Sequence, residues 1–303
     1  MSFSFDVKTE LCKSVPVQKK CCALAECYGI LLYCNTFSAR EVRIITGSDS
    51  FAARIVKLFK KAFGVDLQSQ KTEGQKHSFV ISDPAVIKKI FEAYGYDPES
   101  ALQHHINLAV LEDECCRASF VRGAFLAGGS VMDPAKQYHL ELVTDHSYVC
   151  REAYSILLDM GFDPKDIPRN GHYVIYFKHS EAIEDLLTTI GAPMAAMNIM
   201  EAKVEKNMRN AINRRVNCDS ANADKVVMAA QTQLDAIRKL DRIIGLDELP
   251  DKLQETALLR IANPEASLSD LAMLSDPPMS KSCLSHRLRK LMELAEKTQE
   301  ISD

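Results

Sequence analysis

The sequence of 303 residues has no run of apolar residues as long as the roughly 20 that a bilayer-spanning helix needs. Residues 1–6, MSFSFD, also lack the charged and apolar regions of a secretory signal peptide. These two absences argue against the common routes into or across a membrane. We therefore expect a cytoplasmic protein without a membrane partner.

A surplus of positive charge is missing as well. The chain has 37 Lys and Arg against 41 Asp and Glu, which gives a formal net charge of -4. Residues 1–200 hold 21 of the basic and 24 of the acidic residues. Binding of nucleic acid by overall charge is thereby excluded, and any such contact must come from a local basic patch. The length predicts two or more domains.

The motif C-x-x-C, which holds many structural zinc ions, is absent although the chain has ten cysteines. Two adjacent pairs occur, Cys21-Cys22 and Cys115-Cys116, but their spacing is wrong for a zinc clamp. Reduced and mostly buried thiols are the expected state of cysteines in a cytosolic protein. The sequence accordingly predicts no metal ligands and no cofactor.

The sequence does contain a repeat of about 95 residues, with copies at about 21–95 and 115–191. Gly29 and Gly123 stand at the same distance from the two cysteine pairs. Each copy predicts helix, strands, helix, strands and helix, and glycines follow the later helices as C-terminal caps. The predicted strands are 41–46, 65–68, 78–81, 138–144 and 173–177, and the predicted later helices are 51–63, 84–94, 148–160 and 181–190.

Two such copies predict an α+β domain at residues 1–197 with pseudo-twofold symmetry, since a solenoid needs three or more repeats. The opening helix of each copy is rich in small residues, above all at 122–131, RGAFLAGGSV. We expect the two opening helices to pack closely at the pseudo-twofold axis. The alternative is a glycine-rich loop over a phosphate, which needs a preceding strand and another glycine spacing.

Residues 198–248 predict a helical linker, because they lack proline and keep apolar residues at helical spacing, namely Val227, Ala230, Leu234, Ile237 and Ile244. Asparagine is a poor helix former, yet the linker contains a series of them. One interpretation is that these asparagines hydrogen-bond to DNA or to the C-terminal helices. The alternative is a polar surface helix that is broken near residues 218–220. The asparagines are Asn198, Asn207, Asn210, Asn213, Asn217 and Asn222.

Residues 249–303 predict an all-α helix-turn-helix domain of three helices. Pro250 suits the first position of the first helix, and a residue before proline, here Asn263, ends it. A capping box from Ser267 to Asp270 opens the second helix. The residues predicted to point inward from these two helices are Leu253, Ala257, Leu258, Ile261, Leu268, Leu271 and Ala272.

The third helix follows a turn at Pro277-Pro278, and Ser280 suits its N-cap. Its apolar stripe is Leu284, Leu288, Leu291 and Ala295. Basic groups on the other face neutralise phosphates or pair with guanine, and hydroxyls reach phosphates and base edges. The alternative is a solvated basic face of a small bundle. The predicted DNA-binding residues are Ser280, Lys281, Ser282, Ser285, His286, Arg287, Arg289 and Lys290, with Arg209, Arg214 and Arg215 as secondary contacts.

From Cys21 to about Ala192 the repeat resembles the LAGLIDADG homing-endonuclease fold, and residues 122–131 carry the match best. In that alignment the metal-binding carboxylates belong at Cys34 and Gly128. Neither residue offers the oxygen ligand that magnesium needs for phosphodiester cleavage. A relocated nuclease centre would have to use other acids, which we expect instead to begin helices or fill turns. These acids are Glu26, Asp49, Asp133 and Asp145.

The whole chain resembles the WhiA family of bacterial regulators, and three regions carry the match together. They are residues 122–131, the linker segments 209–214 (RNAINR), 217–219 (NCD) and 221–222 (AN), and the segments 277–282 (PPMSKS) and 286–291 (HRLRKL). Cys283 departs from the small residue expected at its position.

This resemblance implies a non-catalytic protein that binds double-stranded DNA and regulates transcription. It implies a part in cell division and chromosome segregation, in some lineages in sporulation, and a location at the nucleoid. The N-terminal domain is then a scaffold or interaction module for a protein partner, with weak DNA contact as the second choice. An adaptor that acts mainly through protein contacts and a residual metal-dependent nuclease are the alternatives.

Overall fold

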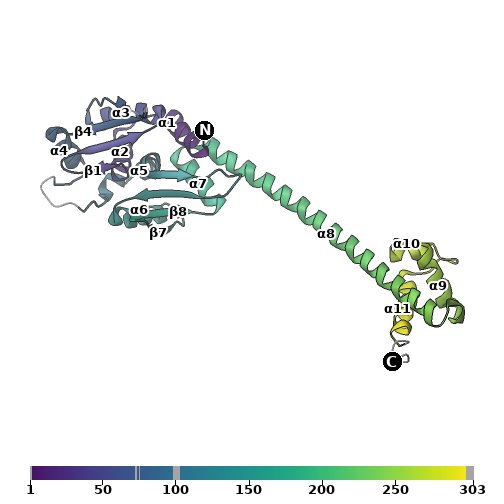
Figure 1. Cartoon of the computed structure of the whole chain (residues 1–303). Coiled ribbons are helices and arrows are strands. Elements are labelled where there is room, and N and C mark those ends of the chain that lie inside the picture. Colours follow the sequence, from purple (N-terminus) through teal and green to yellow (C-terminus); the bar gives the residue numbers. More distant parts are fainter. Residues whose placement is uncertain (1, 72–73, 75, 98–102, 298–303) are drawn as a thin grey trace. The chain divides into compact units, whose positions relative to one another are not determined.

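The computed structural model describes residues 2–71, 74, 76–97 and 103–297 (Figure 1). Helices and strands alternate up to residue 190 and helices alone follow, which confirms the predicted α+β domain and the all-α C-terminal domain. The chain divides into two compact units, Met1–Asn207 and Met208–Asp303.

The first unit repeats one order of elements after a leading helix, α1 (Phe3–Ser14). The first copy consists of α2 (Lys20–Leu32), β1 (Thr36–Phe37), β2 (Val42–Thr46), α3 (Asp49–Phe63), β3 (Gln70–Lys71), β4 (His77–Ile81) and α4 (Pro84–Ala93). After a short 3-10 helix, η1 (Leu108–Leu111), the second copy consists of α5 (Glu114–Gly128), β5 (Gly129–Val131), β6 (Leu140–Thr144), α6 (Ser147–Asp159), β7 (Lys165–Arg169), β8 (His172–Phe177) and α7 (Ser180–Ile190). The matched order confirms the predicted repeat.

Each copy forms one four-stranded antiparallel sheet. The strand orders are β1-β2-β4-β3 and β5-β6-β8-β7, so the two sheets share one topology. In the central pairs Val42 lies opposite Ile81, and Leu140 lies opposite Phe177. Side chains alternate between the faces of a strand, and in β2 Val42 is buried whereas Arg43 is exposed. This equal topology is what the predicted pseudo-twofold symmetry requires.

Helices α2 and α5 pack against each other at two glycines. A Cβ atom added to Gly29 would lie 2.1 Å from the carbonyl oxygen of Phe120, and one added to Gly123 would lie 2.1 Å from that of Glu26. Only glycine permits so close an approach of the two backbones. The predicted helix packing is therefore confirmed. The phosphate-loop alternative is wrong, because these glycines lie inside a helix that precedes a strand.

Several local predictions for this unit were wrong. Residues 65–68 do not form the expected strand, and β3 begins only at Gln70. Strand β7 was not predicted, because it contains Pro168 and all five of its side chains are exposed, so it lacks alternation. Helix ends were predicted better. Gly64 and Gly191 cap α3 and α7 in the left-handed conformation, with φ of 67° and 103°.

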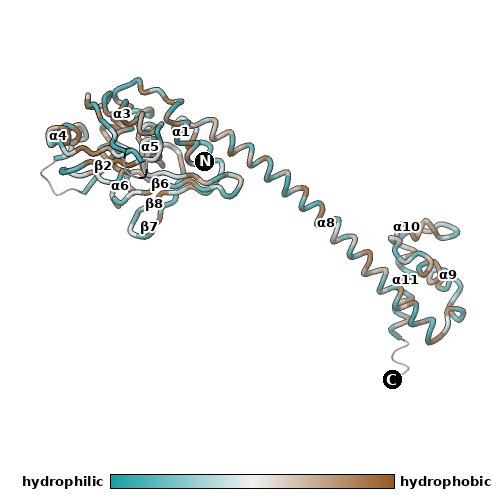
Figure 2. The backbone as a smooth tube through the Cα atoms, turned by 45° about the horizontal axis from the view of Figure 1, so that its top comes forward, coloured by the Kyte–Doolittle hydropathy of each residue, from teal (hydrophilic) through white to brown (hydrophobic). Residues whose placement is uncertain are grey.

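The linker is one uninterrupted helix, α8 (Pro193–Ile243). The break considered near residues 218–220 is not present, and the asparagines of the series are all exposed. Figure 2 shows hydrophilic and hydrophobic residues mixed along the helix. Of its predicted apolar stripe, Ala230, Leu234 and Ile237 are buried, but Val227 and Ile244 are 64% and 40% exposed. Within the described ranges no helix is long and apolar enough to cross a membrane.

The second unit ends in η2 (Leu246–Glu248), α9 (Asp251–Ala262), α10 (Leu268–Met273) and α11 (Lys281–Lys297). Residues 298–303, the end of the predicted domain, lie outside the described residues. One apolar core joins the three last helices to the end of α8. It consists of Ile237, Leu240, Leu249, Leu253, Ala257, Leu271, Ala272, Leu284, Leu288, Leu291 and Ala295.

Helix α9 differs from the prediction in two ways. Pro250 is its N-cap rather than its first helical residue. Leu258 and Ile261 are 51% and 43% exposed, whereas Thr256 and Arg260 are buried. The other predictions for this unit hold better. Ser267 caps α10 by accepting from the backbone N–H of Asp270 at 3.2 Å, and its hydroxyl donates to a carboxylate oxygen of Asp270 at 2.7 Å.

Candidate functional site

The start of α11 is positioned by the turn that precedes it. The hydroxyl of Ser275 donates to the carbonyl oxygen of Ala272 at 2.8 Å and accepts from the backbone N–H of Met279 at 3.1 Å. The hydroxyl of Ser280 then accepts from the backbone N–H of Cys283 at 3.3 Å, so Ser280 acts as the predicted N-cap. These bonds fix where the first turn of α11 stands relative to α10.

The apolar stripe of α11 is buried as predicted, with Leu284, Leu288 and Leu291 at 1% exposure or less. Because one side of the helix is fixed in the core, the opposite side must face outward. Seven of the eight predicted DNA-binding residues are exposed there, together with Cys283. We call these seven the outer face of α11: Ser280, Lys281, Ser282, Ser285, His286, Arg289 and Lys290.

Arg287 is the exception among the predicted residues. Its side chain is only 20% exposed and turns toward α9. One guanidinium nitrogen donates to the carbonyl oxygen of Lys252 at 3.4 Å and lies 3.9 Å from a carboxylate oxygen of Glu255. Arg287 therefore links α11 to α9 and does not belong to the outer face.

The first part of α11 is basic and the last part is mixed. Residues 280–290 contain four Lys and Arg and no Asp or Glu, whereas Glu293 and Glu296 follow. Arg289 makes only an exposed contact of 3.6 Å with Glu293, and such pairs contribute little. For Lys281 and Lys290 the described residues provide no salt bridge. The outer face thus presents uncompensated positive charge to solvent.

Arg260 is a buried residue that the sequence analysis missed as a positioning group. One of its nitrogens donates to the carbonyl oxygens of Ala266, at 2.7 Å, and Asn263, at 3.3 Å. Burial lowers the pKa of its guanidinium below the ordinary value. The side chain ties the turn between α9 and α10 to the core. An arginine one turn before Asn263-Pro264 was the only signal in the sequence.

The secondary residues Arg209, Arg214 and Arg215 lie on α8 and are exposed. Arg214 donates to the carbonyl oxygen of Asn210 in its own helix at 3.3 Å. Exposed guanidinium groups on a helix are suited to phosphate contact.

In the first unit, the two positions that the resemblance assigns to nuclease carboxylates, Cys34 and Gly128, offer no oxygen ligand for magnesium. The Cys34 thiol donates to the carbonyl oxygens of Leu31 and Thr36 at 3.1 and 3.2 Å. Burial raises the pKa of this thiol to about 12. At neutral pH it is a protonated donor rather than an anionic ligand.

Gly128 has no room for an acidic side chain. A Cβ atom there would lie 2.4 Å from the carbonyl oxygen of Val143 and 3.0 Å from a ring carbon of Tyr33. A carboxylate at this position would require the end of α5 or strand β6 to move. The packing of this site is therefore incompatible with the ancestral acid.

The four acids considered as substitutes have other roles. Glu26 was expected to begin a helix or fill a turn, and this was wrong. It is buried in the middle of α2, where its carboxylate binds Arg54 at 2.5 and 2.8 Å and Arg122 at 3.1 Å. Asp133 fills a turn as predicted, and accepts from the backbone N–H of Ala135 at 2.8 Å.

Asp49 and Asp145 each pair with a histidine near the edge of a sheet. Asp49 lies 2.7 Å from His77, which holds the pKa of that carboxyl below its usual value. Asp145 contacts His172, and both line a cavity beside Cys34 and Gly128. Asp49 begins α3 as expected, with its carboxylate in the first turn and Ser48 as the N-cap.

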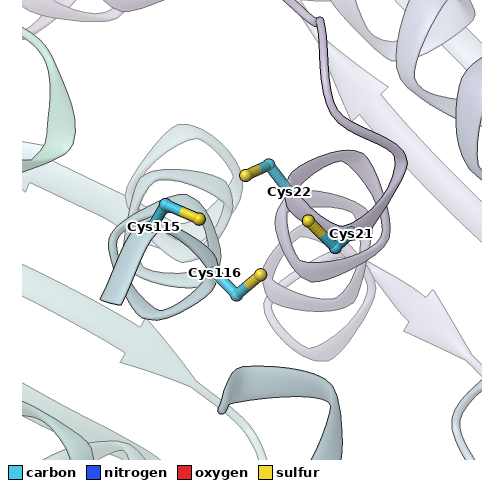
Figure 3. Close-up of side chains that lie close together, drawn as sticks. All are labelled: Cys21, Cys22, Cys115 and Cys116. Carbon is cyan, nitrogen blue, oxygen red and sulfur yellow. The ribbon is translucent and has the colours of Figure 1, made fainter. Parts of the chain in front are cut away.

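The cysteines contradict one expectation. Of the ten cysteines only three are buried, namely Cys27, Cys116 and Cys150, so the thiols are not mostly buried. The two adjacent pairs also come together in space. Cys21 and Cys22 open α2, Cys115 and Cys116 open α5, and the four sulfur atoms lie within 4.8 Å of one another (Figure 3). Spacing within one segment could not reveal this, but the repeat itself places both pairs at equivalent positions.

Comparison with known proteins identifies the family. The family model described as WhiA LAGLIDADG-like domain matches residues 117–209, and that described as WhiA C-terminal HTH domain matches residues 212–295. A protein of Ruminiclostridium cellulolyticum named probable cell division protein WhiA is 37% identical over 98% of both chains. This chain belongs to the WhiA family. A relative of the same name from Clostridium perfringens is 36% identical, again over 98% of both chains.

A solved full-length WhiA structure has the same fold. The crystal structure titled full-length DUF199/WhiA from Thermatoga maritima covers 98% of this chain and 99% of its own, with a TM-score of 0.59 and 23% identity. The family models and the relatives confirm the resemblance predicted from residues 122–131, the linker and the segments 277–282 and 286–291. The chain carries a LAGLIDADG-like domain and a helix-turn-helix domain, as the WhiA family models describe.

Proposed function

We propose that this WhiA family chain binds double-stranded DNA through the outer face of α11 and regulates transcription without cleaving DNA. The observation that carries the proposal is the uncompensated charge of that face, held outward by the buried stripe of the same helix. A recognition helix lies in the major groove with its N-terminal residues against base edges. The wide exposure of Lys281, Ser282 and Ser285 suits that position.

The residues of the outer face have different tasks in this proposal. Ser282, Ser285 and His286 donate to base edges or nearby phosphates, and Lys281, Arg289 and Lys290 neutralise phosphates or pair with guanine. Ser280 caps the helix and so sets the angle at which the face is presented. Arg287 holds α11 against α9. Arg209, Arg214 and Arg215 add contacts that do not depend on base sequence.

The LAGLIDADG-like unit has the task of a scaffold or protein-interaction module. Two arginines of its sheets have acidic partners: Arg43 lies 2.7 Å from Glu41, and Arg169 lies 3.2 Å from Glu141. Matched pairs release few counterions from DNA, so this unit adds little affinity. The protonated Cys34 thiol and the crowded Gly128 argue against catalysis.

The biological setting follows from the relatives. They carry the name probable cell division protein, and we place the regulated genes in cell division and chromosome segregation, with sporulation in lineages that form spores. The protein then acts in the cytoplasm at the nucleoid.

The experiment that tests this proposal is a genome-wide immunoprecipitation of the full chain. We expect discrete sites, and we expect them to vanish in a variant with Lys281, Arg289 and Lys290 all changed to Ala. The matched control changes Lys225, Arg242 and Lys297 to Ala, which removes the same charge elsewhere in the same unit. Equal occupancy in both variants would overturn the proposal.

An adaptor acting through protein contacts is the second candidate, favoured by exposed apolar residues at the end of the helix that precedes α11. Met273 and Leu274 are 73% and 56% exposed at the end of α10. Capture of a division protein that survives nuclease treatment, without discrete genomic sites, would select this candidate instead.

A further inference from the structure

The pairs Cys21-Cys22 and Cys115-Cys116 have no part in DNA binding or in the former nuclease positions. We propose that these four cysteines form a zinc site that joins the N-terminal ends of α2 and α5. The proposal is independent of what the outer face of α11 binds.

The geometry of the four sulfur atoms fits a tetrahedral ion. They all lie within 4.8 Å of one another, and in Figure 3 they point from both helices into the space between the helix ends. In a tetrahedral site with bonds of about 2.3 Å the sulfurs are about 3.8 Å apart, so rotations about the side-chain bonds close the difference. A four-thiolate set favours zinc over magnesium or calcium, which prefer oxygen ligands.

The backbone around the cluster favours thiolates. Cys21 and Cys115 are each the second residue of a helix, where unpaired N–H groups and the positive end of the helix dipole stabilise anions. Two such helix ends converge on the cluster. The Ser119 hydroxyl beside the cluster donates to the carbonyl oxygen of Cys115 at 2.7 Å.

The cysteine cluster is accessible from solvent and is held by rigid elements. Cys22 and Cys115 line a cavity of about 370 Å³, and Cys21 and Cys115 are exposed, so an ion has an open path from solvent. The contact of Gly29 and Gly123 holds α2 and α5 at a fixed separation. The ligands therefore come from two rigid elements rather than from a loop.

The chemistry of loading balances as follows. Four thiols bind one Zn²⁺ and release up to four protons, which leaves a site with a charge of −2. The first unit has a large apolar core of its own, so we expect zinc to add stability rather than to create the fold.

The test is a cobalt titration of the reduced, metal-free full chain. We expect one Co²⁺ per chain, a sulfur-to-cobalt charge-transfer band, the visible bands of a tetrahedral all-sulfur site, and loss of these bands when Zn²⁺ is added. Changing Cys22 and Cys116 to Ser removes the bands. Changing Cys218 and Cys283, which are exposed in the other unit, to Ser leaves them unchanged.

A second measurement keeps the test decisive if the double variant folds poorly. All nine tyrosines lie in the first unit, so tyrosine fluorescence follows its unfolding. Excess Zn²⁺ should raise the unfolding temperature of the wild type, but not that of the variant with exposed Cys21 and Cys115 changed to Ser. A wild type without tetrahedral bands, or the same bands in a cluster variant, would overturn the zinc site. A disulfide between cysteines of the cluster, found in the chain isolated from reducing cytosol, would also overturn the zinc site.

Discussion

Charged side chains have opposite environments in the α2–α5 helix pair and on α11. In the helix pair the carboxylate of Glu26 is buried and bound by Arg54 and Arg122, and the former nuclease positions carry a neutral thiol and a glycine. On α11 four Lys and Arg stand within residues 280–290 without an acid, and all but Arg287 face solvent. Buried charge is matched to hold a fold, whereas exposed and unmatched charge remains available to a polyanion.

The largest effect that distinguishes these regions is expected from Glu26→Ala. It leaves two buried arginines without their anion, and breaking a buried ion pair costs about 3–5 kcal/mol. Tyrosine fluorescence in urea measures this loss in the first unit. The control Glu92→Ala removes an exposed carboxylate of α4 and should change stability by less than about 0.5 kcal/mol. Equal effects of the two changes would show that the Glu26 cluster does not hold the helix pair.

A smaller effect is expected on the DNA side from changing Arg209, Arg214 and Arg215 to Ala. Phosphate contacts from α8 should be worth about tenfold in affinity, and the loss should be the same for target and unrelated duplexes. Fluorescence anisotropy with both duplexes measures it. The triple control at Lys225, Arg242 and Lys297 should bind as the wild type does. A loss confined to the target duplex would mean that α8 reads bases.

The stability of the first unit should also depend on pH, because of the buried His104. Burial first, and then His146, lower the pKa of His104, whose ring nitrogen lies 2.7 Å from the carbonyl oxygen of Phe37. The unfolded chain therefore binds this proton more tightly, so stability falls as pH drops below about 6.5. We expect a measurable loss of stability between pH 7 and 5 from this group.

The variant His104→Gln keeps a nitrogen donor for Phe37 and should flatten this pH dependence. His179→Gln, at an exposed position, should leave it unchanged. Urea unfolding at pH 5, 6 and 7 makes the comparison. If the unfolding free energy changes with pH equally in the wild type and in His104→Gln, then His104 does not cause the pH dependence.

No effect at all is expected when magnesium or manganese is added to the chain with supercoiled plasmid. Cys34 is protonated and Gly128 is crowded, so we expect no nicked product. Asp145 lines the cavity beside both positions and is the acid best placed to contradict this. Metal-dependent nicking that disappears in Asp145→Asn would show a relocated catalytic centre.

Much of this architecture was predictable from the sequence. The predictions that were wrong failed for physical reasons. The equal offsets of Gly29 and Gly123 from the cysteine pairs predicted both the repeat and the helix contact. Apolar spacing misplaced Leu258 and Ile261, because α9 buries Thr256 and Arg260, whose side chains hydrogen-bond to nearby backbone carbonyl oxygens. The Thr256 hydroxyl donates to the carbonyl oxygen of Lys252 at 2.8 Å, and Arg260 binds the next turn.

The candidate sites were also predicted only in part. The buried stripe Leu284, Leu288, Leu291 and Ala295 fixed the outer face of α11 in advance, apart from Arg287, whose long side chain reaches α9. The cysteine cluster was missed because its members come from two helices that are distant in sequence. Ligand spacing is informative only when one segment supplies both ligands.

The most direct test of the central claim is the salt dependence of DNA binding by the full chain. Each phosphate contact contributes a slope of about −0.9 to log K against log salt concentration. Changing Lys281, Arg289 and Lys290 to Ala should weaken target binding about a hundredfold and reduce the slope by about 2 to 3. The control triple at Lys225, Arg242 and Lys297 should keep the wild-type slope. A slope and an affinity unchanged by the loss of the α11 charges would contradict the account.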